Sequence, residues 1–521
     1  MVDTTYAIKR ALVKTTGIVV FVTLISRVLS YFTIVIIGAR FGVSRITDAY
    51  LISLIVPEFF ILLFGTSVGL SLTTLLSEYI TKGNEKQGWE LANIILILSL
   101  ALFSLAAIII FLLSPILSSL LAPGFDIESK ALVTKLSRIA LGYMVFAGLT
   151  SVTRGVLHSY RRFIIPAINP GLLQIVTVIF VLLWSKNFHI LSVNMGLFFG
   201  ALFCFVLQLF SLRNKVLEFK FRLKWNLYLP ELKKTISSIY PLVLYSIIFQ
   251  VNTSVDRIVA STLKTGSVAA LDFAYRINWM FLPVLAGALF TVALPVFSEQ
   301  VVLKDWEGLK EILSLGVRLL NFLIMPISIF MIFMAQPIIR LIFERGAFDT
   351  HATHFTSQAL IMYSLGMVPF TMFQITSCAL IALGESRSIA KLSFIIVLLN
   401  LVLDLILSRY LGHMGIALGT SLVSIFGFWF YMRALQRKVS IISIRDVLGS
   451  IIKIFFVSLI IALMGLLIYN LLGTFINTTI FRGQLIQMII VIFVASILYF
   501  GFSFLIRVKE IKELYLLLKR K

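Results

Sequence analysis

Charged residues and cysteines are scarce in this chain of 521 residues. Charged residues make up only 13% of it, about half the share that is usual in soluble domains, which excludes an ordinary soluble protein. The two cysteines, Cys204 and Cys378, both lie inside apolar runs. We therefore expect no disulfide framework, and we expect both thiols to behave as small buried hydrophobic groups.

Motifs for catalysis, nucleotide binding and metal binding are also missing. The sequence has no P-loop and no evident Ser/His/Asp set. Of its five histidines, His351 and His354 are three residues apart, but no cluster of carboxylates accompanies them, which argues against a metal site. The sequence predicts neither an enzyme nor a cofactor.

Long apolar runs fill the chain instead, since 60% of the residues are hydrophobic. These runs last about 20 residues and do not alternate with a period of two, which favours helical spans over a barrel. We expect an all-α integral membrane protein with 14 transmembrane helices. The predicted spans are 17–40, 47–77, 89–121, 134–158, 163–184, 190–212, 236–262, 268–298, 313–339, 354–382, 388–408, 413–437, 446–472 and 481–507.

The basic residues indicate the orientation of these spans. The formal charge of +22 could suggest nucleic acid, but the lysines and arginines lie in short loops between spans, mostly on one side, as the positive-inside rule expects for cytoplasmic loops. Both termini are therefore predicted to be cytoplasmic, and no nucleic-acid partner is expected. The apolar run after Lys14 is too long for a signal peptide and is expected to be an uncleaved first span.

An internal repeat divides the chain. The stretch GVSRITDAY (42–50) is echoed by GSVAALDFAY (266–275), which aligns Asp48 with Asp272, and two further echoes have nearly the same offset. Six predicted spans separate the copies, so the repeat is parallel: two six-helix lobes related by a pseudo-twofold axis along the membrane normal, followed by two C-terminal helices. Transporters built in this way keep their substrate site between the lobes. The predicted division is 1–212 for the N-lobe, 213–235 for a cytoplasmic amphipathic linker, 236–438 for the C-lobe, and 439–521 for spans 13 and 14 with a cytoplasmic tail.

Charged residues inside the first two spans suggest a polar cavity. Arg27 and Glu58 each lie about ten residues into adjacent spans, so we expect them at similar depth, where an ion pair would lower the cost of burying each charge. A purely structural pair is the alternative to a substrate site. Asp48, just inside the second span, either lines the cavity or interacts with its helix dipole.

The second lobe carries a matching set. Asp256 and Arg257 lie late in span 7, and Asp272 and Arg276 lie early in span 8. Asp272 and Arg276 are four residues apart, so they can pair on one helical face. Alternatively, the planar guanidinium of Arg276 is suited to binding phosphate oxygens.

Five further stretches are informative together: SRVLSYFTIVIIGARFGVSRITDAYLIS (26–53), APGFD (122–126), SYRRFIIPAINP (159–170), ASTLKTGSVAALDFAYRI (260–277) and LIFERGAFD (341–349). They spread over most of the first twelve predicted spans. Together they resemble the MurJ/MviN lipid II flippases of the multidrug/oligosaccharidyl-lipid/polysaccharide exporter superfamily.

This resemblance implies a flippase for an undecaprenyl-diphosphate-linked precursor of peptidoglycan, lipid II, in the bacterial cytoplasmic (inner) membrane. It also implies alternating access around a cationic cavity, with the lipid tail held beside the last two spans. Ser26, Arg27, Asp48 and Arg276 match residues that the family uses in its cavity.

The cationic set is incomplete by the same comparison. Thr33 and Ile61 stand where the family has arginines, and Tyr275 stands where an aspartate commonly precedes the matching arginine. Other groups, such as Arg257 and Arg154, would then hold the diphosphate, or the cargo would be a different lipid-linked saccharide.

Several functions therefore stay open. Lipid II is the leading cargo, and another polyprenyl-diphosphate glycan, for capsule, exopolysaccharide or teichoic acid, is the alternative. A cation-coupled drug exporter would need acidic residues to dominate its cavity, and a non-transporting scaffold would not need charges at mid-membrane. Membrane lipids, a coupling cation and the cell-wall synthesis machinery are the further partners considered.

Overall fold

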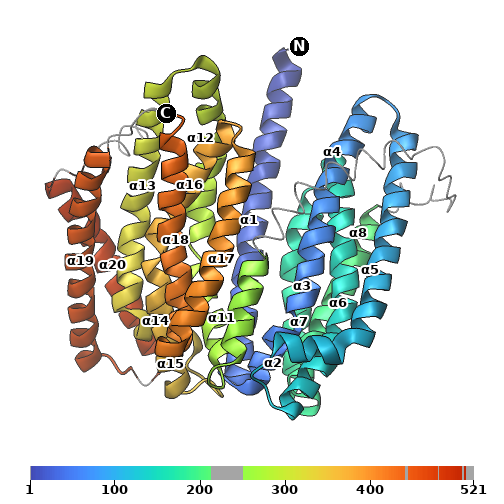
Figure 1. The fold of residues 1–521 in the computed structure, drawn as a ribbon, viewed down its shortest axis with the longest axis horizontal. Coiled ribbons are helices and arrows are strands. Elements are labelled where there is room, and N and C mark those ends of the chain that lie inside the picture. Colours follow the sequence, from blue (N-terminus) through green and yellow to red (C-terminus); the bar gives the residue numbers. More distant parts are fainter. Residues whose placement is uncertain are drawn as a thin grey trace. The chain divides into compact units, whose positions relative to one another are not determined.

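The structure is a computed structural model, and it describes residues 2–212, 250–439, 444–478, 480–506, 508 and 510–511. The predicted amphipathic linker and the end of the predicted cytoplasmic tail lie outside the described residues. Within the described part, all regular secondary structure is helical (Figure 1). The chain forms two compact units, Met1–Val268 and Ala269–Lys521, while the predicted division into lobes, linker and last two spans stays a prediction.

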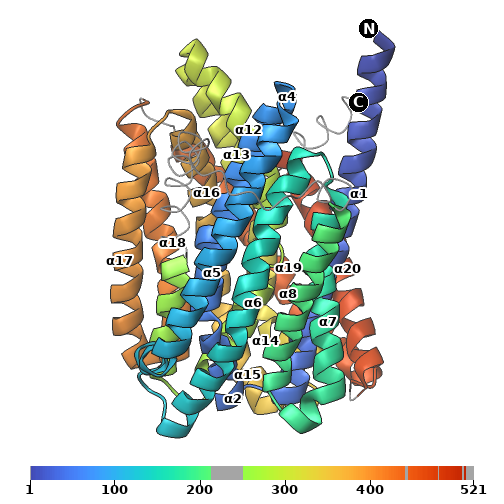
Figure 2. The same ribbon diagram turned by 90° about the vertical axis from the view of Figure 1, so that its right-hand side faces the viewer.

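The first unit is a bundle in which α5, α6, α7 and α8 run beside one another (Figure 2). Its elements are α1 (Val2–Phe41), α2 (Arg45–Ser53), α3 (Ile55–Phe60), the π-helical segment η1 (Ile61–Thr66), α4 (Ser67–Thr81), α5 (Glu85–Leu121), α6 (Ile127–Ser159), α7 (Ile164–Phe188) and α8 (Leu191–Ser211). Residues 250–261 are also helical.

The second unit begins inside α11. Its elements are α11 (Ser267–Asn278), α12 (Leu282–Leu303), α13 (Trp306–Phe333), α14 (Ala335–Phe343), α15 (Thr350–Leu365), α16 (Met367–Ala382), α17 (Ser386–Leu411), α18 (His413–Gln436), α19 (Ile444–Phe475) and α20 (Phe481–Leu505).

Twelve stretches of the described residues are helical, long and apolar enough to cross a membrane. They confirm the prediction of an all-α, multi-pass membrane protein. Two further predicted spans are not among them: 236–262 lies partly outside the described residues, and 268–298 is interrupted by a turn at residues 279–281 between α11 and α12. The total of 14 spans therefore stays a prediction.

The second span is irregular in its middle. Pro57 has no N–H with which to continue the helical hydrogen bonds, and the chain passes from α2 through the short α3 into η1. A π-helical turn holds extra residues, so the side chains before Ile61 face directions different from those that an unbroken helix would give them.

Small residues hold the C-terminal part of this span, α4, against α6. A Cβ atom added to Gly155 would lie 2.1 Å from the carbonyl oxygen of Gly69, so the two backbones touch directly. The Thr73 hydroxyl donates a hydrogen bond to the Gly155 carbonyl oxygen at 3.1 Å. This is the small-residue packing by which membrane helices approach closely.

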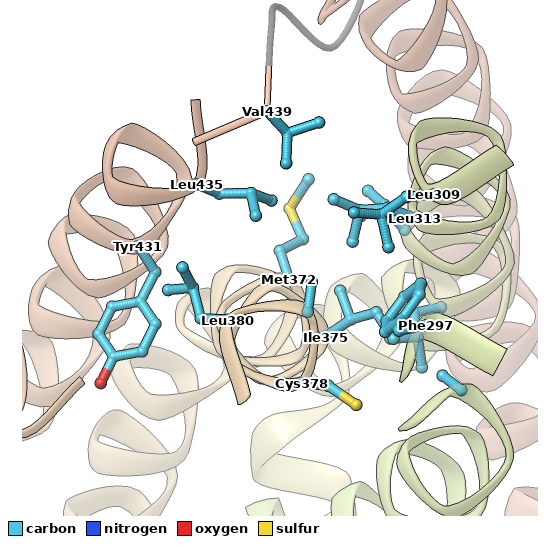
Figure 3. Packing of buried hydrophobic residues seen from close by; sticks show 14 residues of the cluster. Phe297, Leu309, Leu313, Met372, Ile375, Cys378, Leu380, Tyr431, Leu435 and Val439 are labelled. Atoms are coloured by element: carbon cyan, nitrogen blue, oxygen red, sulfur yellow. The ribbon is translucent and has the colours of Figure 1, made fainter. Parts of the chain in front are cut away.

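The core of the second unit lies between α12, α13, α16 and α18 (Figure 3). Phe297, Ile375 and Leu313 are buried members of this core, and Cys378 belongs to it as a small buried side chain, as predicted. The last two helices pack on the other side of α13, where the Tyr499 hydroxyl donates to the carbonyl oxygen of Phe322 at 2.6 Å. They are thus attached to the second unit.

Candidate functional site

Ser26 and Arg27 are neighbours on α1 with different surroundings. Ser26 is buried, and its hydroxyl donates a hydrogen bond to the Ala167 carbonyl oxygen of α7 at 3.1 Å. Gly171 leaves room for this contact, since a Cβ there would lie 2.9 Å from the Ser26 Oγ. Ser26 therefore fixes α1 against α7, whereas the Arg27 side chain is exposed.

The predicted ion pair between Arg27 and Glu58 is wrong. The Glu58 carboxylate instead contacts the guanidinium of Arg257, with 3.0 Å between Oε2 and Nη1. Arg257 is nearly buried, at 12% side-chain exposure, and Glu58 is 32% exposed. The two residues come from α3 and from the helical residues 250–261, so this pair ties two spans of the first unit together.

Asp48 is buried in the first turn of α2. Its Oδ2 accepts a hydrogen bond from the backbone N–H of Gly266 at 2.7 Å. Gly266 has a φ of +87° and lies against Val43, a position that favours glycine. The capping of α2 belongs to Ser44, whose side chain accepts from the Thr47 N–H. Asp48 therefore connects two segments that are distant in sequence. This contact is additional to the interaction that a carboxylate in the first turn of a helix has with the helix dipole.

Other contacts join the same loops. The Arg45 guanidinium donates to the Thr265 hydroxyl at 3.0 Å and lies over the ring of Phe125, 4.4 Å from its centroid. Hydrogen bonds from the Ser129 hydroxyl and N–H hold the pKa of Asp126 below its usual value, and the charge of Arg45 lowers it further. Three of the stretches that carry the family resemblance thus meet in one loop cluster of the first unit.

Arg276 and Asp272 pair on α11, as their spacing predicted. The distance from Nε to Oδ2 is 2.5 Å, and the Arg276 side chain remains 35% exposed while that of Asp272 is 8% exposed. Pairing does not exclude a role in binding, because the remaining guanidinium nitrogens present further donors.

Arg154 lies on α6, five residues before that helix ends at Ser159. It is half-buried, and its Nε is a buried donor without a hydrogen-bond partner among the described residues. His158 follows one turn later. Arg154 is therefore a cation held inside a span with capacity left for an anion.

Two buried carboxylates were not identified from the sequence. Asp404 of α17 is completely buried, accepts from the Asn400 amide at 2.9 Å, and faces Gly419 of α18. An asparagine and an aspartate four residues apart in an apolar run were the signal that could have revealed it. Glu510 is also completely buried, and Ser450 donates to it at 2.5 Å; nothing in its basic surroundings in the sequence indicates burial.

No cluster of three or more potential metal ligands occurs among the described residues. Each charged residue that the sequence suggested is thus placed within its own unit, and five of them have the close partners described above: Glu58 with Arg257, Asp272 with Arg276, and Asp48 with the backbone N–H of Gly266. Among the suggested arginines, Arg27 has an exposed side chain and Arg154 has a buried Nε without a hydrogen-bond partner among the described residues, so both have donors available for a ligand.

Comparisons with known proteins agree with one another. A family model described as lipid II flippase MurJ matches residues 37–493. Curated relatives carry the name probable lipid II flippase MurJ: the protein from Synechocystis is 27% identical, with 84% of this chain and 83% of that protein covered. The protein from Thermotoga maritima is 28% identical, with 94% and 96% covered.

Solved structures show the same fold. A lipid II flippase MurJ in an inward closed conformation matches with a TM-score of 0.74 and 24% identity, covering 93% of this chain and 98% of the other. An inward-facing multidrug transporter of the MATE family gives a TM-score of 0.65 at 16% identity, covering 80% and 96%. The family match runs through the broken second span, the loop cluster and α11, and with it the resemblance noted in the sequence is confirmed: this chain belongs to the MurJ family.

Proposed function

We propose that this protein is a flippase that moves lipid II from the cytoplasmic to the outer leaflet of the bacterial inner membrane. The family match over residues 37–493 carries the proposal, and the relatives named for this activity support it. Charged side chains inside membrane spans are costly and therefore usually functional. The headgroup crosses by alternating access while the polyprenyl tail stays in the lipid.

Four of the suggested residues are arginines, which provide the chemistry that a diphosphate needs. Guanidinium groups bind phosphate oxygens through paired, charge-assisted hydrogen bonds. Arg27 is exposed and Arg154 has spare donors, so these two are ready to receive an anion. Arg257 and Arg276 are paired with Glu58 and Asp272, so their binding of cargo is an exchange of one anion for another.

This exchange has a use in a transport cycle. A transporter must also return without cargo, and an arginine left without a counter-ion inside the membrane raises the energy of that step. The carboxylates of Glu58 and Asp272 take the place of the diphosphate during the return. Ser26 and Asp48 act by positioning: Ser26 fixes α1, and Asp48 fixes the loop that precedes α11.

We further propose that a cation, H⁺ or Na⁺, couples to transport at Asp404. A completely buried carboxylate beside an amide is a suitable place for a proton or a hard cation. Replacing Asp404 with Asn should remove the dependence of flipping on the cation gradient, whereas Glu307→Gln, at an exposed carboxylate, should keep it. An unchanged gradient dependence in Asp404→Asn would contradict this role.

Another lipid-linked glycan is the second candidate for the cargo. Thr33 and Ile61 stand where arginines were expected, and Glu58 engages Arg257, so the cationic set differs from that of the family. Complementation of a strain depleted of its lipid II flippase decides between the two cargoes: rescue identifies lipid II, and failure with normal expression favours another glycan.

The proposal is tested with purified protein in liposomes that contain a fluorescent lipid II analogue. Arg27→Ala and Arg276→Ala should each slow flipping at least tenfold, since a charge-assisted hydrogen bond contributes about 1.5–3 kcal/mol. Arg433→Ala is the matched control, because Arg433 lies over the ring of the exposed Trp429. Unchanged flipping in both variants would remove these residues from the site. Recruitment of the cell-wall synthesis machinery, and cytoplasmic positions for both termini, complete the proposal.

A further inference from the structure

Two aromatic residues, Tyr275 and Trp279, are close to Arg276 in the sequence, at the end of α11 in the second unit. Tyr275 precedes it on α11, and Trp279 lies in the turn at residues 279–281 that ends the helix. Their ring centroids are 5.3 Å apart, and both side chains are half-buried. Residues three and four positions apart on a helix are neighbours, so Trp279 follows Arg276 on the same side of the helix end and also lies next to Tyr275, which directly precedes Arg276 in the chain.

Two more rings fix this pair from α15 and α16. Tyr363 meets Tyr275 edge-on, with centroids 5.6 Å apart and planes at 69°. Phe370 meets Trp279 in the same manner, at 5.0 Å and 62°. Edge-to-face contacts of this kind are favourable arrangements of aromatic rings. Tyr275 and Trp279 are therefore held in defined orientations.

Simple core packing does not account for this group. The same unit contains a second aromatic cluster, Phe273, Phe343 and Phe348, with centroids 5.1 to 5.7 Å apart. All three of those rings are at most 2% exposed. Tyr275 and Trp279 are packed as closely but keep accessible surface, and the side chain of Arg276, which lies between them in the sequence, is itself 35% exposed.

The chemistry of the proposed cargo places a sugar here. In a polyprenyl-diphosphate saccharide the first pyranose is joined through its anomeric oxygen directly to the diphosphate. A diphosphate held by Arg276 therefore brings that ring within a few ångströms of the residues next to Arg276. One face of a pyranose consists mainly of C–H groups, which carry a slight positive charge and pack against the negative face of an aromatic ring.

We propose that Tyr275 and Trp279 form a platform on which the first sugar of the cargo stacks while Arg276 contacts the diphosphate. This inference rests on the proposed function and adds the part of the cargo that the aromatic residues recognise. It assigns the discrimination between a sugar-bearing lipid and a bare polyprenyl diphosphate to the turn after α11.

The test compares the binding of two lipids to the full-length protein in detergent: a short-chain polyprenyl diphosphate, and the same lipid carrying one N-acetyl amino sugar. The wild-type protein should bind the sugar-bearing lipid more tightly. Trp279→Ala should reduce that preference about five- to tenfold and leave the affinity for the bare diphosphate within about twofold. Trp279→Phe should retain most of the preference, whereas Arg276→Ala should weaken the binding of both lipids by a similar factor.

Trp429→Ala is the matched control, since Trp429 is 47% exposed and contacts Arg433 instead; it should change neither affinity. Tyr275→Leu gives a second, independent measurement if Trp279→Ala does not yield folded protein. Equal losses for both lipids in the platform variants, or no loss, would overturn the platform. Failure of the wild-type protein to bind either lipid would instead count against the proposed function.

Discussion

A carboxylate beside an arginine has to be displaced before that arginine can bind another anion. The Arg257 Nη1 atom lies 3.0 Å from the Glu58 Oε2 atom, and the Arg257 side chain is only 12% exposed. Removing one partner of such a partly buried ion pair is costly, because the other charge then stays without a counter-ion in surroundings of low polarity. The contact thus stabilises the first unit and also keeps Arg257 occupied.

Removing the carboxylate separates these two effects. Glu58→Gln should lower the free energy of unfolding by about 1–2 kcal/mol, less than for a fully buried pair because Glu58 is one-third exposed. The same variant should bind a polyprenyl diphosphate more tightly, since Arg257 no longer has to exchange partners. Thermal unfolding in detergent and lipid titration measure the two quantities.

The double variant Glu58→Gln/Arg257→Gln provides the necessary control. Its loss of stability should be smaller than the sum of the two single losses, as expected for residues in contact. Glu78→Gln, in an exposed pair with Lys82, should change stability by no more than about 0.5 kcal/mol. Strict additivity at positions 58 and 257 would mean that the contact contributes nothing.

The pairing of Glu58 also shows how far the sequence could lead at this scale. Apolar runs give the depth of a residue in a span, and Arg27 and Glu58 do have similar predicted depths. Depth does not give the direction in which a side chain points around the helix axis, and Pro57 and η1 change that direction. Asp272 and Arg276 were predicted correctly because their contact lies within one helical turn.

At the scale of elements, the second span combines a fixed half with an irregular half. Its C-terminal part, α4, touches α6 backbone to backbone through Gly69 and Gly155. Its N-terminal part carries Asp48 and Glu58 ahead of the π-helical segment. π-Helical turns are frequent at functional sites because they adjust the direction of one half of a helix relative to the other. Pro57 is the residue in the sequence that explains the irregular half, whereas nothing in the sequence shows which half packs closely against α6.

The contact between α4 and α6 can be tested with one methyl group. Gly155→Ala places a Cβ only 2.1 Å from the Gly69 carbonyl oxygen, so the helices must separate, and stability should fall by about 2 kcal/mol. Gly501→Ala is the matched control in α20, where a Cβ would meet no atom within 4 Å. Thermal unfolding should distinguish the two variants clearly; equal unfolding temperatures would show that the close approach is not needed.

At the scale of the whole molecule, composition and family resemblance gave the fold class correctly. A run of about 20 apolar residues predicts a transmembrane helix from its own length and composition, without knowledge of its neighbours. The buried Asp404 and Glu510 escaped prediction, because their burial depends on helices brought together by folding. The orientation of the chain in the membrane is a further global property, and it stays a prediction from the positions of the basic residues.

Orientation can be tested at the two ends of a single helix. The helix α5 has 37 residues, about 55 Å at 1.5 Å per residue, and so it is longer than the hydrocarbon core. Lys86 is exposed near its start, and Ile127, 87% exposed, follows the loop at its end. The native thiols Cys204 and Cys378 are buried, so they should give little background labelling. On intact cells, an impermeant maleimide should label Ile127→Cys and not Lys86→Cys, and permeabilised cells should show both. Labelling of Lys86→Cys on intact cells would reverse the orientation and place the arginine-rich loops outside, where the positive-inside rule does not expect them.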